Sequence, residues 1–278
     1  MTRDTSWRRL ARNPMAMGGV VVLTLIVLLA LFGSGLSVHA IDDVFWDRIS
    51  APPDVEAGFY FGTDANGRDL FVRTVLGARV SLLVGLAASL ISLVIGVAYG
   101  AVAGFWGGHV DSVMMRIVDI LYSLPFVFFV ILLTVYVGRS LSTIFITIGA
   151  VIWLDMARIV RGQTLALKQR EFVEAARAFG ATNRRILVSH IIPNLLGPVI
   201  ISMLLVIPDA ILTESFLSFL GLGVQEPNTS WGVLIGEGAQ SMTEAPWMLL
   251  FPGAFLAVTL LAFNFFGDGL RDALDPKE

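Results

Sequence analysis

Three carboxylates inside or beside long apolar runs are the residues best placed to do chemistry in this chain. Asp119 directly precedes one apolar run, and Asp209 and Glu214 interrupt another. A carboxylate within a membrane is energetically costly, so it indicates a function such as lining a passage, meeting the ammonium group of a substrate or gating an outer mouth. The alternative is that Asp119 reaches cytoplasmic water and that the other two face an outer aqueous vestibule. Pro208 is expected to kink or end the helix there.

The residues that other chemistries need are missing from the sequence. Cysteine is absent, and the three histidines, His39, His109 and His190, are too dispersed to form a metal cluster. The two lysines, Lys168 and Lys277, do not follow the glycine spacing of a phosphate-binding loop. We therefore expect no catalytic residue, metal or cofactor in this chain, and any energy taken from ATP must come from another subunit.

The composition indicates a membrane protein. Hydrophobic residues make up 56% of the 278 residues, charged residues make up 15%, and the mean hydropathy is +0.79. In a soluble domain about a quarter of the residues are charged. The small net charge of −3 argues against a nucleic-acid partner. The first apolar run is too long for the core of a signal peptide, so we expect it to be retained as an anchor.

Six apolar segments reach or approach the length of about 20 residues that a helix needs to cross a bilayer. They predict an all-α membrane protein whose termini lie on the same side. The fourth segment is short and must extend past Asp155 to cross. The segments are Pro14–Val38, Val80–Gly108, Ile120–Gly138, Ser140–Leu154, Ile191–Val224 and Ala245–Gly267.

The basic residues indicate that the termini are cytoplasmic. Most of the 19 lysines and arginines lie in the N-terminal tail, between the second and third segments, in residues 155–190 and in the C-terminal tail. The loop after Val224 carries glutamates but no lysine or arginine. We expect two parts: residues 1–78, with the tail, the first span and an extracytoplasmic loop, and residues 79–278, a five-helix core with a cytoplasmic loop at about 160–192.

An amphipathic segment lies within that cytoplasmic loop. Phe172, Ala175, Ala176 and Phe179 follow the spacing i, i+3, i+4 and i+7, which predicts one apolar face of a helix that docks in a groove of a partner. Gly180 is suited to end the helix, and Thr182 or Asn183 to cap the next one. The alternative is a helix lying on lipid headgroups with nearby arginines as phosphate anchors: Arg177, Arg184 and Arg185.

The same segment resembles the EAA loop of ABC-importer permeases. The resemblance rests on Glu174-Ala175-Ala176, on Gly180 after three intervening residues, and on Ile192-Pro193. It implies a coupling helix that docks on a separate ATPase, with Glu174 in contact with that subunit. The general pattern has a branched aliphatic residue where this chain has His190, and a histidine at this position resembles the dipeptide/oligopeptide subgroup. The coupling residues implied are Phe172, Glu174, Ala175, Ala176, Phe179, Gly180, Arg184, Arg185, His190 and Pro193.

Further motifs resemble the C-type permease subunits of dipeptide and oligopeptide importers. They are Phe61–Asp64, Gly67–Asp69, Gly77–Leu82, Ser218–Gly223, Ser230–Gly232 and Gly267–Pro276. The resemblance implies the type I ABC importer permease fold in the bacterial cytoplasmic membrane, and import of di- or oligopeptides by alternating access. The implied partners are a second homologous permease, two ATPase subunits that hold ATP and Mg, an extracytoplasmic peptide-binding protein and membrane lipid.

Several alternatives stay open at the level of sequence. The same architecture could carry a nickel chelate, glutathione or an antimicrobial peptide. A proton-coupled transporter could use Asp119, Asp209 or Glu214 but would not need a coupling loop, and a membrane enzyme would need a catalytic cluster that the sequence lacks. Glycines 96, 100 and 104 form a ridge of small residues that packs either within the chain or against a second permease. The segment Gly62–Asp69 is either a structural turn, in which Arg68 pairs with Asp69, or a partner contact.

Overall fold

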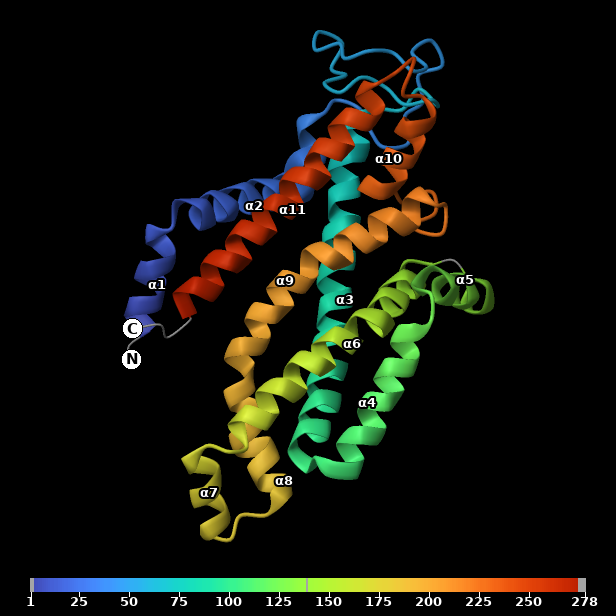
Figure 1. The fold of residues 1–278 in the computed structure, drawn as a ribbon. Coiled ribbons are helices and arrows are strands. Elements are labelled where there is room, and N and C mark those ends of the chain that lie inside the picture. Colours follow the sequence, from blue (N-terminus) through green and yellow to red (C-terminus); the bar gives the residue numbers. More distant parts are fainter. Residues whose placement is uncertain (1–2, 139, 275–278) are drawn as a thin grey trace. The chain divides into compact units, whose positions relative to one another are not determined.

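The computed structural model describes residues 3–138 and 140–274, which are mostly helical (Figure 1). Within these residues the only β pairings are isolated bridges at Asp54–Phe59 and Thr63–Asp69. The helices are α1 (Arg3–Arg12), α2 (Pro14–Phe32), the 3-10 turn η1 (Gly33–Leu36), α3 (Leu70–Trp106), α4 (Gly108–Ser123), α5 (Phe126–Val137), α6 (Leu141–Leu167), α7 (Glu171–Ala178), α8 (Asn183–Ile186), the π-helical segment η2 (Leu187–Ile191), α9 (Ile192–Phe219), α10 (Trp231–Gln240) and α11 (Trp247–Leu274).

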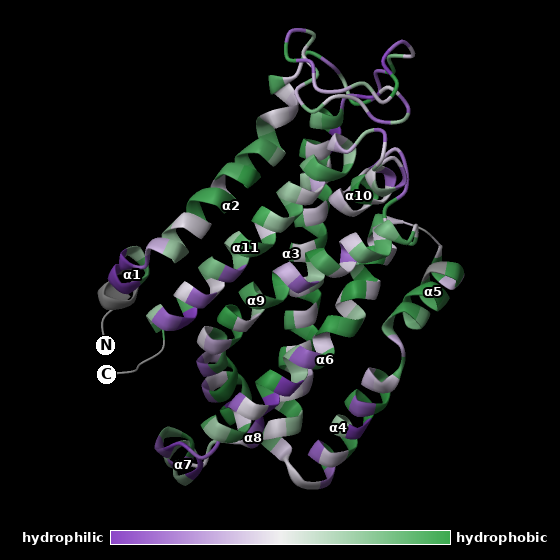
Figure 2. Cartoon of the chain, turned by 45° about the horizontal axis from the view of Figure 1, so that its top comes forward, coloured by the Kyte–Doolittle hydropathy of each residue, from purple (hydrophilic) through white to green (hydrophobic). Residues whose placement is uncertain are grey.

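Five stretches of helix are long and apolar enough to cross a membrane: Pro14–Leu36, Leu70–Trp106, Leu141–Leu167, Asn183–Phe219 and Trp247–Leu274. Hydrophobic residues run along α2 and α5, whereas α1 is mostly hydrophilic (Figure 2). The third span, expected over Ile120–Gly138, corresponds to the pair α4 and α5, which begins at Gly108 and is bent by 86°. The bend follows from Pro125, because the residue before a proline avoids helical geometry and Leu124 is extended. Six spans result when this pair counts as one.

The ends of the spans differ from those expected. The fourth span continues as α6 to Leu167. The fifth begins as α8, passes through η2 and ends at Phe219 rather than Val224. Pro208 does not end this helix, which continues for eleven residues beyond it.

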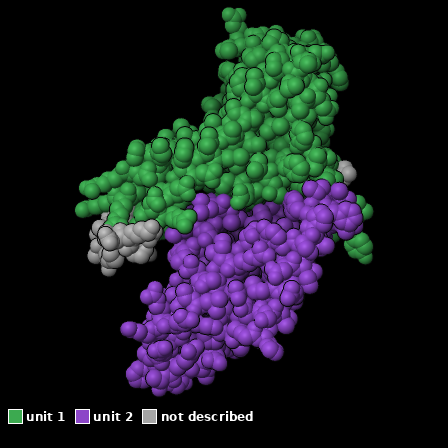
Figure 3. Space-filling model, in the orientation of Figure 1, with its two compact units in different colours: residues 1–86, 134–144, 207–278 green, residues 87–133, 145–206 purple. Residues whose placement is uncertain are grey.

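The chain folds into two compact units (Figure 3). Helices α3, α5, α6 and α9 each contribute residues to both units. Unit 1 comprises residues 1–86, 134–144 and 207–278, and unit 2 comprises residues 87–133 and 145–206. In unit 1, α2 and α11 lie side by side (Figure 1). Glycine allows this approach, because a Cβ added at Gly19 would lie 2.6 Å from the carbonyl oxygen of Ala262.

In unit 2, the glycine ridge of α3 packs on α6. A Cβ added at Gly96 would lie 2.6 Å from the Met156 side chain, and one at Gly104 would lie 2.8 Å from the Arg161 carbonyl oxygen. The interpretation of this ridge as packing within the chain is therefore confirmed. Nearby, Arg161 forms a two-pronged ion pair with Asp111 of α4, with Nε–Oδ1 and Nη2–Oδ2 distances of 2.5 and 2.6 Å.

Candidate functional site

Helix α7 is held by one face and exposes the other. Val173 is fully buried in the core of unit 2, and Ala176 packs against the same core. Phe172 is 39% exposed, Phe179 is 92% exposed, and Ala175 is also exposed. Three of the four residues of the predicted apolar face, Phe172, Ala175 and Phe179, are therefore exposed. Ala176 is half-buried because it lies three residues after Val173 and shares its side of the helix.

The end of α7 is fixed by a Schellman motif. Gly180 has a φ of +78°, its N–H donates to the carbonyl oxygen of Arg177 at 2.9 Å, and the N–H of Ala181 donates to that of Ala176 at 3.0 Å. Thr182 then caps α8 by accepting a hydrogen bond from the backbone N–H of Arg185. The predicted stop at Gly180 and the Thr182 alternative for the cap are both confirmed.

The connection from α8 to α9 contains a feature that the sequence analysis missed. Residues Leu187–Ile191 form one π-helical turn that ends two residues before Pro193. Proline cannot donate a backbone hydrogen bond, and its ring clashes with the carbonyl group four residues earlier. A widened turn relieves that clash while the chain stays helical. His190 lies in this turn, half-buried, and its carbonyl oxygen accepts a hydrogen bond from the Asn194 amide at 2.6 Å.

The charged residues around α7 face solvent. Glu174, Arg184 and Arg185 are exposed, and no residue that the structure describes forms an ion pair with any of them. Exposed aromatic rings beside unpaired charges are typical of a protein-binding surface. We call this the coupling surface, and define it by Phe172, Glu174, Ala175, Phe179, Arg184 and Arg185.

In unit 1, residues 37–69 fold into a cap on the start of α3. Asp69 caps this helix, because its Oδ1 accepts from the backbone N–H of Phe71 at 2.8 Å. Its Oδ2 accepts from the Ser37 hydroxyl at 2.9 Å and lies 3.0 Å from His39 Nδ1. Gly62 and Gly67 adopt positive φ angles, so the predicted turn structure of this segment is confirmed.

Arg68 does not pair with Asp69, contrary to that interpretation. Its Nε donates to Asp64 and its Nη1 to Glu226, both at 2.8 Å. Asp69 is occupied by the helix cap and by His39, so the guanidinium turns to Asp64 four residues back. The hydrogen bond from Arg68 lowers the pKa of Glu226.

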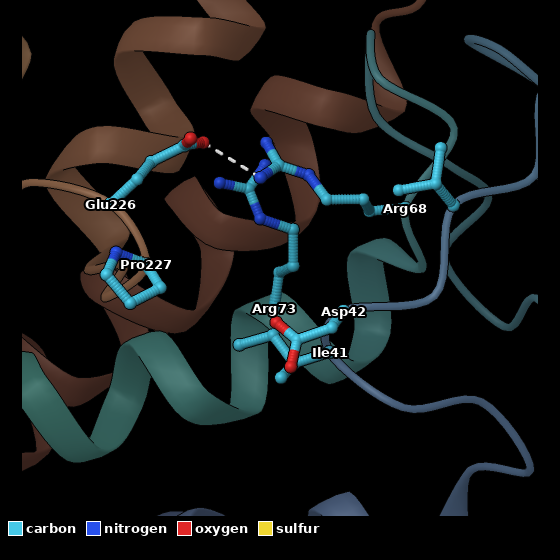
Figure 4. Close-up of a pocket in the computed structure, with 7 residues that line it drawn as sticks. Ile41, Asp42, Arg68, Arg73, Glu226 and Pro227 are labelled. Atoms are coloured by element: carbon cyan, nitrogen blue, oxygen red, sulfur yellow. Dashed lines mark hydrogen bonds and ion pairs between the residues drawn. The ribbon is translucent and has the colours of Figure 1, made fainter.

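A hollow of about 430 Å³ opens beside this arginine, and Figure 4 shows Arg68, Arg73 and Glu226 converging on it. Arg73 is nearly fully buried and binds Asp64 and Glu237, with an Nη1–Oε2 distance of 2.6 Å to Glu237. The lining residues are Ile41, Asp42, Val44, Arg68, Arg73, Glu226 and Pro227.

Comparison with known proteins identifies the family. Residues 96–278 match the model of the binding-protein-dependent transport system inner membrane component, which is more than half of the chain. The chain belongs to this family. Residues 2–53 match the N-terminal transmembrane domain of oligopeptide transport permease C. The chain is therefore a multi-pass inner-membrane permease with the type I ABC importer fold. The expected boundary between residues 78 and 79 stays a prediction.

Curated relatives cover nearly the whole permease. It is 55% identical to the oligopeptide transport system permease protein OppC of Escherichia coli over 98% of this chain and 90% of the relative. It is 52% identical to the OppC protein of Haemophilus influenzae, over 98% and 87%. It is 48% identical to the dipeptide transport system permease protein DppC of Bacillus subtilis, over 99% and 86%.

The three intramembrane carboxylates of the permease lie in different surroundings. Asp119 of α4 is exposed and pairs with Arg158 of α6 at 2.9 Å, and the Arg158 guanidinium also lies 4.5 Å from the centre of the Tyr122 ring. Asp209 is exposed on α9. Glu214 is fully buried, so in this structure it does not face an outer vestibule. A role of these residues in a passage stays a prediction.

Glu214 is the centre of a buried cluster of serines. The hydroxyl groups of Ser218 and Ser81 donate to its two carboxylate oxygens at 2.6 and 3.2 Å. Ser81 also accepts from the backbone N–H of Trp231, a fully buried residue whose indole N–H donates to the carbonyl oxygen of Thr74. The cluster therefore ties α3, α9 and α10 of unit 1 together. Sequence reasoning noted the Ser-Trp-Gly motif but had no signal that it meets Glu214.

Proposed function

We propose that this permease is one of two membrane subunits of an ATP-driven importer that carries di- or oligopeptides into the bacterial cytoplasm. The family match supports the importer class, and the names of the relatives, which are oligopeptide and dipeptide transport permeases, support the cargo. The complex then contains a second homologous permease, two ATPase subunits with ATP and Mg, and an extracytoplasmic peptide-binding protein. Both termini lie in the cytoplasm.

The observation that carries the proposal is the coupling surface. Phe179 is 92% exposed on a helix whose opposite face is anchored in the core, so α7 offers a rigid ridge rather than a loose loop. Burying one such phenylalanine in a groove contributes about 1.5–3 kcal/mol. Glu174 and the two arginines supply charges for partner residues. A movement of the docked ATPase is then transmitted through the Gly180 turn and α8 into α9.

In this proposal the partner ATPases supply the energy, and the transmembrane helices change conformation. Closure of the ATPases on ATP pulls α7, and the helix bundle changes the side to which its passage opens. Asp209 is the first candidate for a passage-lining residue, because it is exposed on a membrane-crossing helix. In the proposal Asp119 and Glu214 act on the passage through the contacts that they make with neighbouring helices.

Reconstitution of the four-subunit complex in proteoliposomes tests the proposal. We expect uptake of a labelled peptide that requires ATP inside, requires the binding protein outside and continues in the presence of a proton uncoupler. Glu174→Arg should insert normally but lose most uptake and most peptide-stimulated ATP hydrolysis. The exposed Glu171, on the same helix turn, supplies the matched control Glu171→Arg. Uphill uptake by this chain without an ATPase, or uptake abolished by the uncoupler alone, would reject the proposal.

The cargo needs a separate measurement. A panel of dipeptides and oligopeptides, glutathione and a nickel chelate is presented with the cognate binding protein, and uptake is followed for the wild-type complex and for Asp209→Asn. We expect uptake of peptides and a change of rate or peptide preference in the variant. Uptake of only the non-peptide solutes would move the cargo to the alternative class, and a variant with wild-type rates for every peptide would remove Asp209 from the passage.

A further inference from the structure

The cap of unit 1 presents an exposed tryptophan within a cluster of unpaired carboxylates. Trp46 is 77% exposed, and Ile49 and Val44 are 50% and 38% exposed. Asp42, Asp43 and Asp47, which are their neighbours in the sequence, are also exposed, and no described residue forms an ion pair with any of the three. We define these six residues, Asp42, Asp43, Val44, Trp46, Asp47 and Ile49, as the outer platform.

The backbone beneath the platform is fixed. Phe45 turns inward between His39 and Phe59, with ring centres 4.9 and 5.1 Å away, and its N–H donates to the carbonyl oxygen of Gly67 at 2.9 Å. Arg48 pairs with Asp54 at 2.8 Å. Residues on either side of Trp46 are therefore held by the fold, while Trp46 and Asp47 face solvent. A tryptophan presented on a fixed backbone loses little conformational freedom when it is buried by a partner.

The charge around the platform specifies a basic partner. Residues 39–69 contain seven carboxylates and two arginines, and residues 220–246 add three glutamates without a lysine or arginine. The hollow in Figure 4 shares Asp42 and Val44 with the platform. Its two arginines are matched by Asp64, Glu226 and Glu237, so Asp42 is an additional carboxylate without a cation. The carboxylates of these segments outnumber their cations, which favours a partner that presents lysine or arginine side chains.

From this surface we infer that the outer platform is the docking site for a basic surface of the extracytoplasmic binding protein. The inference rests on the proposed function, which supplies that partner. Trp46 enters an apolar pocket of the binding protein, and lysines or arginines around that pocket face the three aspartates. Buried tryptophans at the centre of an interface commonly carry most of its affinity, and surrounding charges mainly increase the rate of association.

A membrane surface is the competing partner for an exposed tryptophan, because tryptophans gather at the interface of a bilayer. The composition of the platform disfavours it. Anionic headgroups attract lysine and arginine, whereas here three unpaired aspartates lie within five residues of Trp46 and would be repelled. A protein with a positive surface satisfies both the indole ring and the carboxylates.

The test titrates binding protein against the complete complex in nanodiscs and measures ATP hydrolysis, first at one lipid composition and then in a series in which only the fraction of anionic lipid changes. Trp46→Ala should raise the half-saturating concentration of binding protein about tenfold and leave the maximal rate unchanged. The triple variant Asp42→Asn, Asp43→Asn, Asp47→Asn should raise the half-saturating concentration of binding protein at low ionic strength. It should also remove most of the dependence of that concentration on salt. The controls are Phe32→Ala, a 69% exposed aromatic residue of α2, and Asp272→Asn, an exposed carboxylate of α11.

The outcomes separate this inference from the function on which it rests. A Trp46→Ala titration identical to that of Phe32→Ala would overturn the docking site. A lower maximal rate that follows the fraction of anionic lipid, with half-saturation unchanged, would overturn it in favour of a membrane anchor. If the binding protein fails to stimulate even the wild-type complex, the proposed function fails and the inference fails with it.

Discussion

Truncation of one side chain on α7 tests the coupling surface without disturbing the fold. Phe179 is 92% exposed, so the permease itself gains almost nothing from its ring. Docking in a groove would bury that ring and contribute about 1.5–3 kcal/mol. Since 1.4 kcal/mol is a factor of ten, Phe179→Ala should weaken the affinity of the permeases for the ATPase subunit about 10- to 100-fold. The melting temperature of the isolated permease should not change.

The matched control is Val173→Ala on the opposite face of the same helix. Val173 is fully buried in the core of unit 2, so its truncation should destabilise the permease by about 2 kcal/mol. The affinity for the ATPase should change little once the protein is folded. Val173→Ala should therefore change thermal unfolding in detergent but not ATPase binding. Phe179→Ala should change the titration of reconstituted permeases with the ATPase but not thermal unfolding.

A particular pattern of results would refute the reasoning. If Phe179→Ala binds the ATPase within twofold of the wild type, the exposed ridge is not the docking face. If it lowers the melting temperature as much as Val173→Ala does, the ring packs within the permease. If its effect depends on anionic lipid and not on the ATPase, α7 is an interfacial helix on lipid headgroups.

Three further substitutions probe the elements that support the two surfaces. Gly180→Ala should destabilise the turn after α7 by about 1–2 kcal/mol, because a side chain disfavours the positive φ there although the surrounding space is open. Faster hydrogen exchange in α7 and α8 would report this loss, and unchanged exchange would contradict it. Glu214→Ala should destabilise the permease by about 1–3 kcal/mol, because it leaves the buried Ser81 hydroxyl without its acceptor, and Glu214→Gln should destabilise it less. Unchanged thermal stability of both variants would show that the serine cluster does not hold α3, α9 and α10 together. Gly104→Ala should cost about 1–3 kcal/mol in thermal stability through overlap with the α6 backbone, whereas Gly253→Ala, where nothing lies within 4 Å, should cost nothing.

The membrane architecture was predictable because its signals are local. Long uncharged runs and a ridge of glycines report on the segment in which they lie, and they predicted the spans and a close packing of α3 on another helix. Pro125 and Pro208 mark the limit of such signals. Both are prolines in apolar helices, yet the chain bends beside the first and stays helical through the second. Sequence spacing alone does not distinguish these two outcomes.

The polar contacts were not predictable because their partners lie far apart in the chain. Arg68 was expected to choose its neighbour Asp69, but it binds Glu226, 158 residues away. Glu214 was expected near water, yet it meets Ser81, 133 residues away, and is fully buried. On α7, the periodicity gave the apolar face, but only the packing of Val173 determined that Ala176 belongs to the core side.

Exposed apolar residues of this chain fall into two kinds, and the difference indicates their partners. On α2, side chains such as Leu28 and Leu31 are exposed in a run without any charge, and hydrocarbon satisfies them completely. Phe179 and Trp46 are exposed beside charged groups that no described residue pairs with. A lipid tail cannot solvate those charges, and water cannot satisfy the rings. A surface that is apolar at its centre and charged at its rim would satisfy both, and this is the kind of protein partner that we propose for the two surfaces.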